Sequence, residues 1–201
     1  MANKQKMKLK DFILSDNTKI RKTTINDIPQ LREIFAIARQ FMVKTGNPNQ
    51  WVDGYPSDEQ LMEDIESGDS YVVEKNDKVV ATFVLRGGID PTYNKIYGGE
   101  WLNEEPYATI HRIASTGEIK GIMNIAMTFA LKQYENIRID THSDNKVMQQ
   151  IAKKEGFRYC GIINCRNGTE RLAYQYTKTA TQESETLSLL LKYSELSKFK
   201  Q

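Results

Sequence analysis

Two glycines and a lysine stand between a strand-like run and an apolar helical stripe in residues 115–130, STGEIKGIMNIAMTFA. A helix that begins after such a turn has unpaired backbone N–H groups at its start, with the positive end of the helix dipole behind them. Gly121 lacks a Cβ and lets a ligand approach the backbone, and Lys120 adds positive charge nearby. The stretch therefore suits a phosphate-binding site, although many helices also begin after glycine without any ligand.

Residues 107–114, YATIHRIA, form the predicted strand that leads into this turn. Alternation places its side chains on two faces, one with Tyr107, Thr109, His111 and Ile113 and the other with Ala108, Ile110 and Arg112. After the turn, apolar residues repeat at helical spacing, so a helix is expected from about Glu118 to Gln133. The turn therefore joins the end of a strand to the start of a helix.

Strand and helix signals alternate along the rest of the chain. Further strands are expected at 19–23, in a hairpin over 71–88 that turns at Asn76-Asp77, at 136–141, and in a final hairpin across Arg166-Asn167-Gly168. Further helices are expected from Thr24 to about Gly46, over 57–67, and from Asp144-Asn145 to a left-handed cap at Gly156. The pattern predicts one mixed α/β core.

Composition limits the classes of function. The 201 residues are 39% hydrophobic and 27% charged, and the net charge is only +2, so no strong footprint for nucleic acid is present. No window approaches about 20 apolar residues, and the N-terminus has no signal-peptide pattern. We therefore expect a cytoplasmic protein that binds neither nucleic acid nor membranes.

The two cysteines, Cys160 and Cys165, have no Cys or His partners at zinc spacing, so no metal is expected. Their spacing alone allows a disulfide. Nothing in the sequence indicates an oxidising compartment, which favours free thiols.

The order of elements resembles the GCN5-related N-acetyltransferase (GNAT) superfamily over about residues 19–177, and bacterial members in particular. The resemblance is carried by TINDIPQLREIFAIA, YVVEKNDKVVATFVL, IHRIASTGEIKGIM, IRIDTHSDN and NKVMQQIAKKEGFRYCG. It implies a GNAT-type acyl-CoA N-acyltransferase fold of the α/β (α+β) class. In that fold a twisted mixed sheet of about six to seven strands, flanked by helices, splays between strands 107–114 and 136–141.

The same resemblance implies that acetyl-CoA lies in the gap between those two strands. The pantetheine arm would pair, as an extra strand does, with main-chain groups of Ile113, Ala114 and Ser115. The pyrophosphate would be held by main-chain groups of Lys120, Gly121, Ile122, Met123 and Asn124. A further cofactor contact is expected from Asn145, at the start of the later helix.

Two departures from the family pattern affect this expectation. The phosphate turn commonly has Gln or Arg, two residues, Gly, one residue, then Gly or Ala, and here those places hold Glu118, Gly121 and Met123. Glu118 repels a pyrophosphate unless it points away, and Met123 narrows the approach. Many relatives also place before "GF" a tyrosine that protonates the leaving thiolate, and the corresponding residue here is Ala152.

An amine that attacks a thioester must lose a proton, and the carbonyl must be polarised. The backbone N–H of Ile113 or Ala114 can polarise the carbonyl. The candidates for the catalytic base are His111, Glu100 and His142, because both histidines and the loop with Glu100 border the expected gap. Each histidine has a structural alternative: His111 as a hydrogen-bonded sheet residue, and His142 as a turn or capping residue.

Trp51, Tyr55 and Trp101 stand in loops where similar proteins receive the acceptor, and their alternative role is packing. The leading hypothesis is an acetyl-CoA-dependent N-acetyltransferase that acts by direct attack of a primary amine, on a small molecule or a peptide. Two alternatives stay open: an acyl-CoA-binding module without efficient catalysis, and an interaction protein that uses its tail.

Three regions are expected: a basic lead-in over 1–17, the GNAT domain over 18–178 and a helical tail over 179–201. The tail gathers leucines, Leu187 among them, on one side. That side could pack on its own domain or on a second subunit, which leaves a homodimer open.

Overall fold

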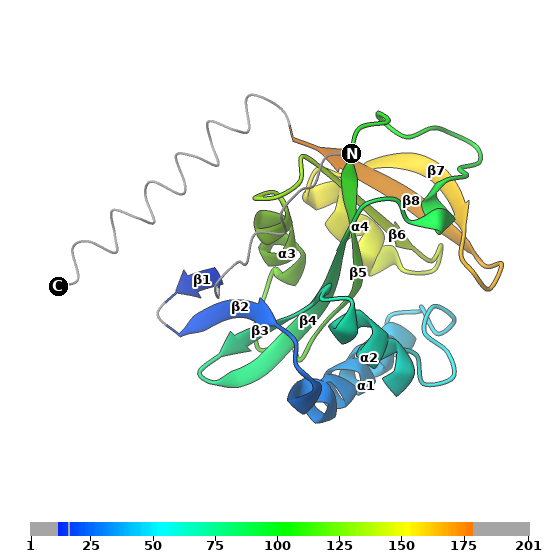
Figure 1. Cartoon of the computed structure of the whole chain (residues 1–201). Coiled ribbons are helices and arrows are strands. Elements are labelled where there is room, and N and C mark those ends of the chain that lie inside the picture. The colour runs from blue at the N-terminus through cyan, green and yellow to red at the C-terminus, as the bar shows by residue number, and fades with distance from the viewer. Residues whose placement is uncertain (1–11, 16, 179–201) are drawn as a thin grey trace.

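The computed structural model describes residues 12–15 and 17–178. Most of the lead-in expected over 1–17 and the whole tail expected over 179–201 lie outside the described residues, so the packing of the tail and the homodimer stay predictions. The described residues form one sheet of eight strands with four α-helices (Figure 1). The strands are β1 (Phe12–Ser15), β2 (Thr18–Lys22), β3 (Ser70–Lys75), β4 (Lys78–Gly87), β5 (Tyr107–Ser115), β6 (Asn136–Thr141), β7 (Arg158–Asn164) and β8 (Glu170–Thr177).

The strands lie in the order β1-β2-β3-β4-β5-β6-β8-β7. Neighbouring strands are antiparallel except β5 and β6, which are parallel. Strands β3 and β4 turn at Asn76 and Asp77, whose φ angles of 50° and 61° suit a two-residue hairpin turn. The hairpin predicted over 71–88 and the mixed, helix-flanked sheet are both confirmed.

The four α-helices of the described part cover the two faces of the sheet (Figure 1). Leu31 of α1 and Leu61 of α2 pack in a cluster on one face. Met123 of α3 and Ala152 of α4 belong to a larger cluster on the other face. The helices are α1 (Ile28–Lys44), α2 (Asp58–Glu66), α3 (Ile122–Ala130) and α4 (Lys146–Lys154), with short 3-10 turns η1 (Ile25–Asp27) and η2 (Pro91–Tyr93).

One strand more than the expected six to seven is present, because β1 lies in the segment interpreted as a solvated lead-in. Its Phe12 ring packs on Phe129 with the ring centroids 5.7 Å apart. The ammonium of Lys132 lies 4.0 Å from the centroid of the same ring. Contact with α3 therefore orders a segment whose composition alone suggested no structure.

Helix α3 is shorter than the expected 118–133. Gly121 has φ 71°, a left-handed conformation that cannot continue a helix toward the N-terminus, so α3 begins at Ile122. The glycine turn and the helix start that the sequence predicted are thus both present, three to four residues later than expected.

A β-bulge interrupts β5 at Arg112. The register between β4 and β5 shifts so that Phe83 stands opposite both Arg112 and Ile113, and Arg112 has φ 48°. The simple alternation predicted for this strand is therefore wrong beyond His111. Ile113 packs with the cluster that holds Ile110, whereas Arg112 reaches toward α2 on the opposite face.

The bulge stands just beyond the point where β5 and β6 separate. Only three pairs join these two strands, from Tyr107–Asn136 to Thr109–Arg138. A bulge bends its strand and increases the local twist, which directs the rest of β5 away from β6. The splay predicted between strands 107–114 and 136–141 is confirmed.

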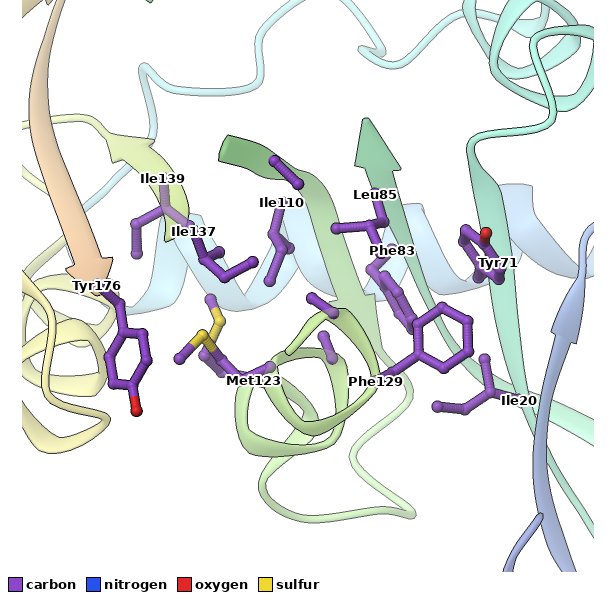
Figure 2. Close-up of a cluster of buried hydrophobic side chains, with 14 of the residues drawn as sticks. Ile20, Tyr71, Phe83, Leu85, Ile110, Met123, Phe129, Ile137, Ile139 and Tyr176 are labelled. Atoms are coloured by element: carbon purple, nitrogen blue, oxygen red, sulfur yellow. The ribbon is translucent and has the colours of Figure 1, made fainter. Parts of the chain in front are cut away.

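The larger core cluster fixes α3 against the sheet. Figure 2 shows Met123 and Phe129 pointing from α3 toward the strands. The centroid of the Phe129 ring lies 4.8 Å from that of Tyr71 and 5.9 Å from that of Phe83. One aromatic side chain thus anchors the helix that begins after the glycine turn.

Substitution Phe129→Ala should lower the free energy of unfolding by about 3–5 kcal/mol, because it removes a buried ring and leaves a cavity. Urea titration followed by circular dichroism measures the loss. The matched control is Phe41→Ala, whose side chain is 52% exposed on α1 and should change stability by less than about 1 kcal/mol. Equal losses in the two variants would contradict the anchoring role.

Candidate functional site

A cleft of about 650 Å³ opens where β5 and β6 separate. Its walls include Ile110–Ile113 of β5 and Ile139 and Asp140 of β6, the residues just beyond the paired segment. The loop between α1 and α2 and the turn between β7 and β8 contribute the outer walls, and the starts of α3 and α4 contribute Met123 and Asn145. Its volume is that of a small-molecule site.

The start of α3 has the open amides that the sequence predicted. No side chain caps the helix at Gly121, so the N–H groups of Ile122, Met123 and Asn124 have no partner within the helix. A Cβ added at Gly121 would meet no heavy atom within 4 Å among the described residues. The Met123 side chain does not obstruct this approach, because it is buried in the core below Ile110 (Figure 2).

Glu118 is turned away from the helix start. Its carboxylate Oε1 lies 2.8 Å from Nζ of Lys78 on β4, and the hydrogen bond from Lys78 lowers the pKa of Glu118. The negative charge that departs from the family pattern is thus paired outside the cleft. Lys120 and Gly121 are both exposed.

The edge of β5 that faces β6 has no strand partner beyond Thr109 in the described part of the chain. Ile113 lines the cleft, and Ala114 is buried with the α1 side of the core. Ser115 is half-buried, and its Oγ accepts a hydrogen bond from the N–H of Gly117 at 3.0 Å. An extended ligand could pair with this edge through main-chain hydrogen bonds.

His111 lies in the cleft between two carboxylates. Its Nε2 is 3.2 Å from Oδ2 of Asp90, and its Nδ1 is 3.8 Å from Oδ1 of Asp140. The Tyr93 hydroxyl donates to the same Asp140 oxygen at 2.6 Å, and burial, followed by the charge of Asp140, raises the pKa of Tyr93 well above its ordinary value. Tyr93 therefore remains a donor.

The environment of Asp90 decides the tautomer of His111. Burial raises the pKa of Asp90, but hydrogen bonds from His111 and from the side chain and backbone of Thr92 outweigh burial and lower the pKa well below its usual range. An ionised carboxylate only accepts hydrogen bonds. A hydrogen on Nε2 of His111 satisfies this contact, which leaves Nδ1, 3.8 Å from Oδ1 of Asp140, as the ring nitrogen that can accept a proton.

The side chain of Arg112 ties the bulge to the acceptor side of the cleft. Its Nη2 lies 2.6 Å from Oδ1 of Asp64 on α2, and its Nη1 donates to the Tyr55 hydroxyl at 2.9 Å. Burial raises the pKa of Asp64, and the charge of Arg112 offsets part of that rise. Tyr55 and Arg112 both line the cleft, so one predicted acceptor residue is fixed directly by the bulge.

The other predicted residues fall into two groups. Trp51 lines the cleft and also packs edge-on against Phe35 at 5.6 Å between ring centroids; its contact with an acceptor stays a prediction. Trp101 packs instead: it stacks on Tyr93 at 5.5 Å, and the guanidinium of Arg138 lies 3.9 Å from its ring centroid. Trp101 therefore supports Tyr93 by stacking on one face of its ring.

Glu100 and His142 do not belong to the lining of the cleft. Glu100 is exposed in the loop before β5. His142 accepts a hydrogen bond through Nδ1 from the N–H of Asp144 at 3.2 Å, in the turn before α4. The structure thus brings His111 together with the cofactor-side residues and does not bring these two candidates to it.

The cleft residues that the sequence did not predict include Asp90, Asp140 and Gln50. Asp140 is the one acid in the apolar run of β6, a signal that could have identified it. Asp90 precedes Pro91, so its sequence context is that of an ordinary turn residue. It is also a turn residue in the structure, because its Oδ1 accepts hydrogen bonds from the N–H and the hydroxyl of Thr92. Gln50 had no distinguishing signal, because three of its four partners lie 91–95 residues away in sequence.

Asn145, predicted to contact the cofactor, is buried at the start of α4. Its Oδ1 accepts a hydrogen bond from the N–H of Met148 at 2.9 Å and so caps the helix. Its Nδ2 donates to Oε1 of Gln50 at 2.9 Å. The residue thus lines the cleft and has structural partners on both sides.

Cys160 and Cys165 are free thiols, as expected. Among the described residues, no group of three or more His, Cys, Asp or Glu is placed to hold a metal ion. No described helix has the length and apolar character needed to cross a bilayer.

Comparison with known proteins identifies the family. A solved structure of a GNAT-family acetyltransferase from Streptococcus agalactiae is 32% identical to this chain, with a TM-score of 0.69, and the match covers 81% of this chain and 96% of that one. The chain belongs to the GNAT acetyltransferase family. Its bacterial relatives and its sheet of diverging strands agree with this membership. No protein-family model and no curated protein matches the chain.

Two more distant structures share the fold of this GNAT acetyltransferase. One is the acetyltransferase from Salmonella typhimurium that modifies the N-terminal serine of ribosomal protein L7/L12, with 15% identity, a TM-score of 0.57, and coverage of 85% of this chain and 100% of that one. The other is RimL, the L7/L12 α-N-protein acetyltransferase, in complex with coenzyme A, with 12% identity, a TM-score of 0.55, and coverage of 84% and 98%.

Substitution Asp90→Asn should make stability depend less on pH. The folded-state pKa of Asp90 lies below its unfolded value of about 3.9, so the ionised form stabilises the fold above that pH and the contribution is lost as pH falls through the folded pKa. At pH 7 the variant should be less stable by about 1–3 kcal/mol, the value of hydrogen bonds to a charged group. The difference should narrow only below about pH 4.

Urea titrations from pH 7 to pH 3 measure this difference. The control is Asp144→Asn, since the side chain of Asp144 is 43% exposed and its contact with His142 is 3.4 Å; it should cost less than about 1 kcal/mol. If the difference in free energy of unfolding between the wild type and Asp90→Asn stays constant down to pH 3, the fold does not hold the Asp90 carboxylate ionised.

Proposed function

We propose that this GNAT acetyltransferase transfers the acetyl group of acetyl-CoA to the N-terminal amine of a peptide or protein, with His111 as the catalytic base. The observation that carries the proposal is the position of His111. His111 lies in the same cleft as Ile113 of β5 and Met123 at the start of α3. A base, an extended binding edge and an anion site are what acetyl transfer from an acyl-CoA needs.

The residues that would hold acetyl-CoA fit its chemistry. The uncapped N–H groups of Ile122, Met123 and Asn124 suit the pyrophosphate, and Lys120 adds a cation at the same exposed turn. The β5 edge over Ile113–Ser115 suits the amide groups of the pantetheine arm. RimL, which shares the fold, has been solved with coenzyme A and supports this arrangement. Bound there, acetyl-CoA supplies an activated acetyl group.

His111 moves the proton. An amine arrives largely as an ammonium ion, and the two carboxylates beside His111 favour a positive charge at this point. Nδ1 accepts one proton from the ammonium, which frees the amine lone pair for attack on the thioester carbonyl; the nitrogen loses a second proton to solvent as the C–S bond breaks and the thiolate leaves. Asp90 and Asp140 then stabilise the imidazolium that forms. The proton passes from the ring to solvent, since the His111 side chain is 18% exposed.

The leaving thiolate has no tyrosine to protonate it. Ala152 stands where many relatives carry that tyrosine, and it is fully buried in α4. A thiol has a pKa of about 8.5, so a thiolate leaves without the help that a poorer leaving group requires. We infer that solvent protonates it.

The acceptor is proposed from two lines of support. The structures that share the fold include an enzyme that modifies the N-terminal serine of a ribosomal protein. The outer walls of the cleft, formed by Trp51 and Tyr55 on one side and by the turn at Arg166 and Asn167 on the other, leave room for a chain that continues away from its amine. A primary amine of a small molecule is the other acceptor class to be tested.

Thiol release from acetyl-CoA tests the proposed function. A peptide with a free N-terminus should be acetylated, and the same peptide with its N-terminus blocked and a lysine retained should not. Substitution His111→Gln should lower turnover by about 10²–10⁴-fold, the usual contribution of a general base, while the affinity for acetyl-CoA stays within about twofold. His142→Gln, at the other histidine, is the control and should retain turnover.

Three outcomes would change the assignment. Turnover with small amines alone would overturn the peptide acceptor, and equal turnover by His111→Gln would remove that residue from the reaction. Binding of acetyl-CoA by calorimetry with no thiol release on any amine would favour the binding module, which the alanine at position 152 makes the second candidate.

A further inference from the structure

Gln50 lies at the centre of a hydrogen-bond cluster that spans the cleft. Its Oε1 accepts from Nδ2 of Asn47 at 2.9 Å and from Nδ2 of Asn145 at 2.9 Å. The same oxygen also accepts hydrogen bonds from the Thr141 hydroxyl at 3.3 Å and from the N–H of His142 at 3.4 Å. A single amide oxygen thus gathers donors from the loop after α1, the end of β6 and the start of α4.

These donors belong to two parts of the sheet, which share the larger core cluster around α3 and whose strands β5 and β6 pair along a short segment. Strands β1–β5 form one part with α1 and α2, and strands β6–β8 form the other with α4; the three residue pairs at the start of β5 and β6 connect them. At the opposite, divergent end Gln50 is the side chain through which the α1–α2 loop bonds to β6 and α4. Gln50 therefore acts as a strut, meaning that it connects the two parts of the sheet at the end where β5 and β6 diverge.

The donor groups are buried, so the loss of their acceptor destabilises the structure. Thr141 has no exposed surface, and Asn145 is 7% exposed. Asn47 is 1% exposed, and its Oδ1 already lacks a partner among the described residues. If the Gln50 oxygen moves away, these groups must bind water or remain unpaired, and a buried unpaired polar group is unfavourable.

We propose that Gln50 is a positioning residue that sets the width of the cleft and holds the next residue, Trp51, at its wall. The kinetic consequence of this inference rests on the proposed function, whereas its structural consequence does not. Gln50 couples the acceptor loop to Asn145, the residue predicted to contact acetyl-CoA, through one 2.9 Å hydrogen bond. Loosening the strut should therefore weaken the binding of both substrates.

Among the described residues the hydrogen bonds of Gln50 all use its amide oxygen, which yields a sharp test. Gln50→Glu keeps an acceptor in the same place, because a carboxylate oxygen accepts the same bonds. Gln50→Ala removes it. The matched control is Gln149→Ala on α4: Gln149 donates to the carbonyls of His142 and Ser143 in the same turn, yet has no partner on the α1–α2 loop.

In steady-state kinetics, Gln50→Ala should raise KM for acetyl-CoA and for the peptide by about tenfold or more, and should change kcat less. A tenfold rise in KM corresponds to about 1.4 kcal/mol of lost binding free energy. Gln50→Glu and Gln149→Ala should stay within about threefold of the wild type. A loss in Gln50→Glu as large as in Gln50→Ala would overturn the proposal, as would wild-type KM values in Gln50→Ala.

A second readout needs no substrate and separates this inference from the proposed function. Trp51 is one of two tryptophans, and Trp101 is packed between Tyr93 and Arg138, away from the loop. Acrylamide should quench tryptophan emission more strongly in Gln50→Ala than in the wild type, and to the wild-type extent in Gln50→Glu and Gln149→Ala. Unchanged quenching in Gln50→Ala would contradict the strut whether or not the enzyme acts on peptides.

Discussion

The backbone of Arg112 stands in the left-handed region, and the rest of the cleft depends on its staying there. A non-glycine residue at φ 48° costs about 1–3 kcal/mol, and the buried pair of Arg112 with Asp64, together with the Tyr55 hydroxyl, holds the side chain that this backbone directs toward α2. Removing one partner of a buried ion pair costs about 3–5 kcal/mol. Flattening the bulge would strand one of these buried charges at a cost larger than the strain, so the bulge persists.

Several features of the site follow from that bulge. It stands where β5 leaves β6, so the edge of β5 beyond Thr109 remains unpaired and the cleft opens beside it. His111 precedes the bulge and faces Asp90 and Asp140, while Arg112 faces the acceptor loop through Tyr55. Adjacent residues thereby supply the proposed proton acceptor and the contact that fixes Tyr55, and Gln50 bonds across the divergent end of the same opening.

The sequence predicted the parts whose signals are local. The glycine turn before α3, the hairpin at Asn76-Asp77 and the cap at Asn145 each depend on residues within a few positions, and each is present. The bulge was missed because Arg112 carries no glycine or proline that would mark it. Asp90 and Gln50 were missed for a related reason: their roles come from partners 21 and 91–95 residues away, which only the folded sheet brings together.

The central claim is that acetyl-CoA pairs with the free edge of β5 and with the open amides of α3 in one cleft. Amide hydrogen exchange, followed by mass spectrometry with and without saturating acetyl-CoA, tests it most directly. The account predicts slower exchange in both Ile113–Ser115 and Ile122–Asn124, with the hairpin of β3 and β4 unchanged. Binding of acetyl-CoA that leaves exchange in these two segments unaltered would contradict it.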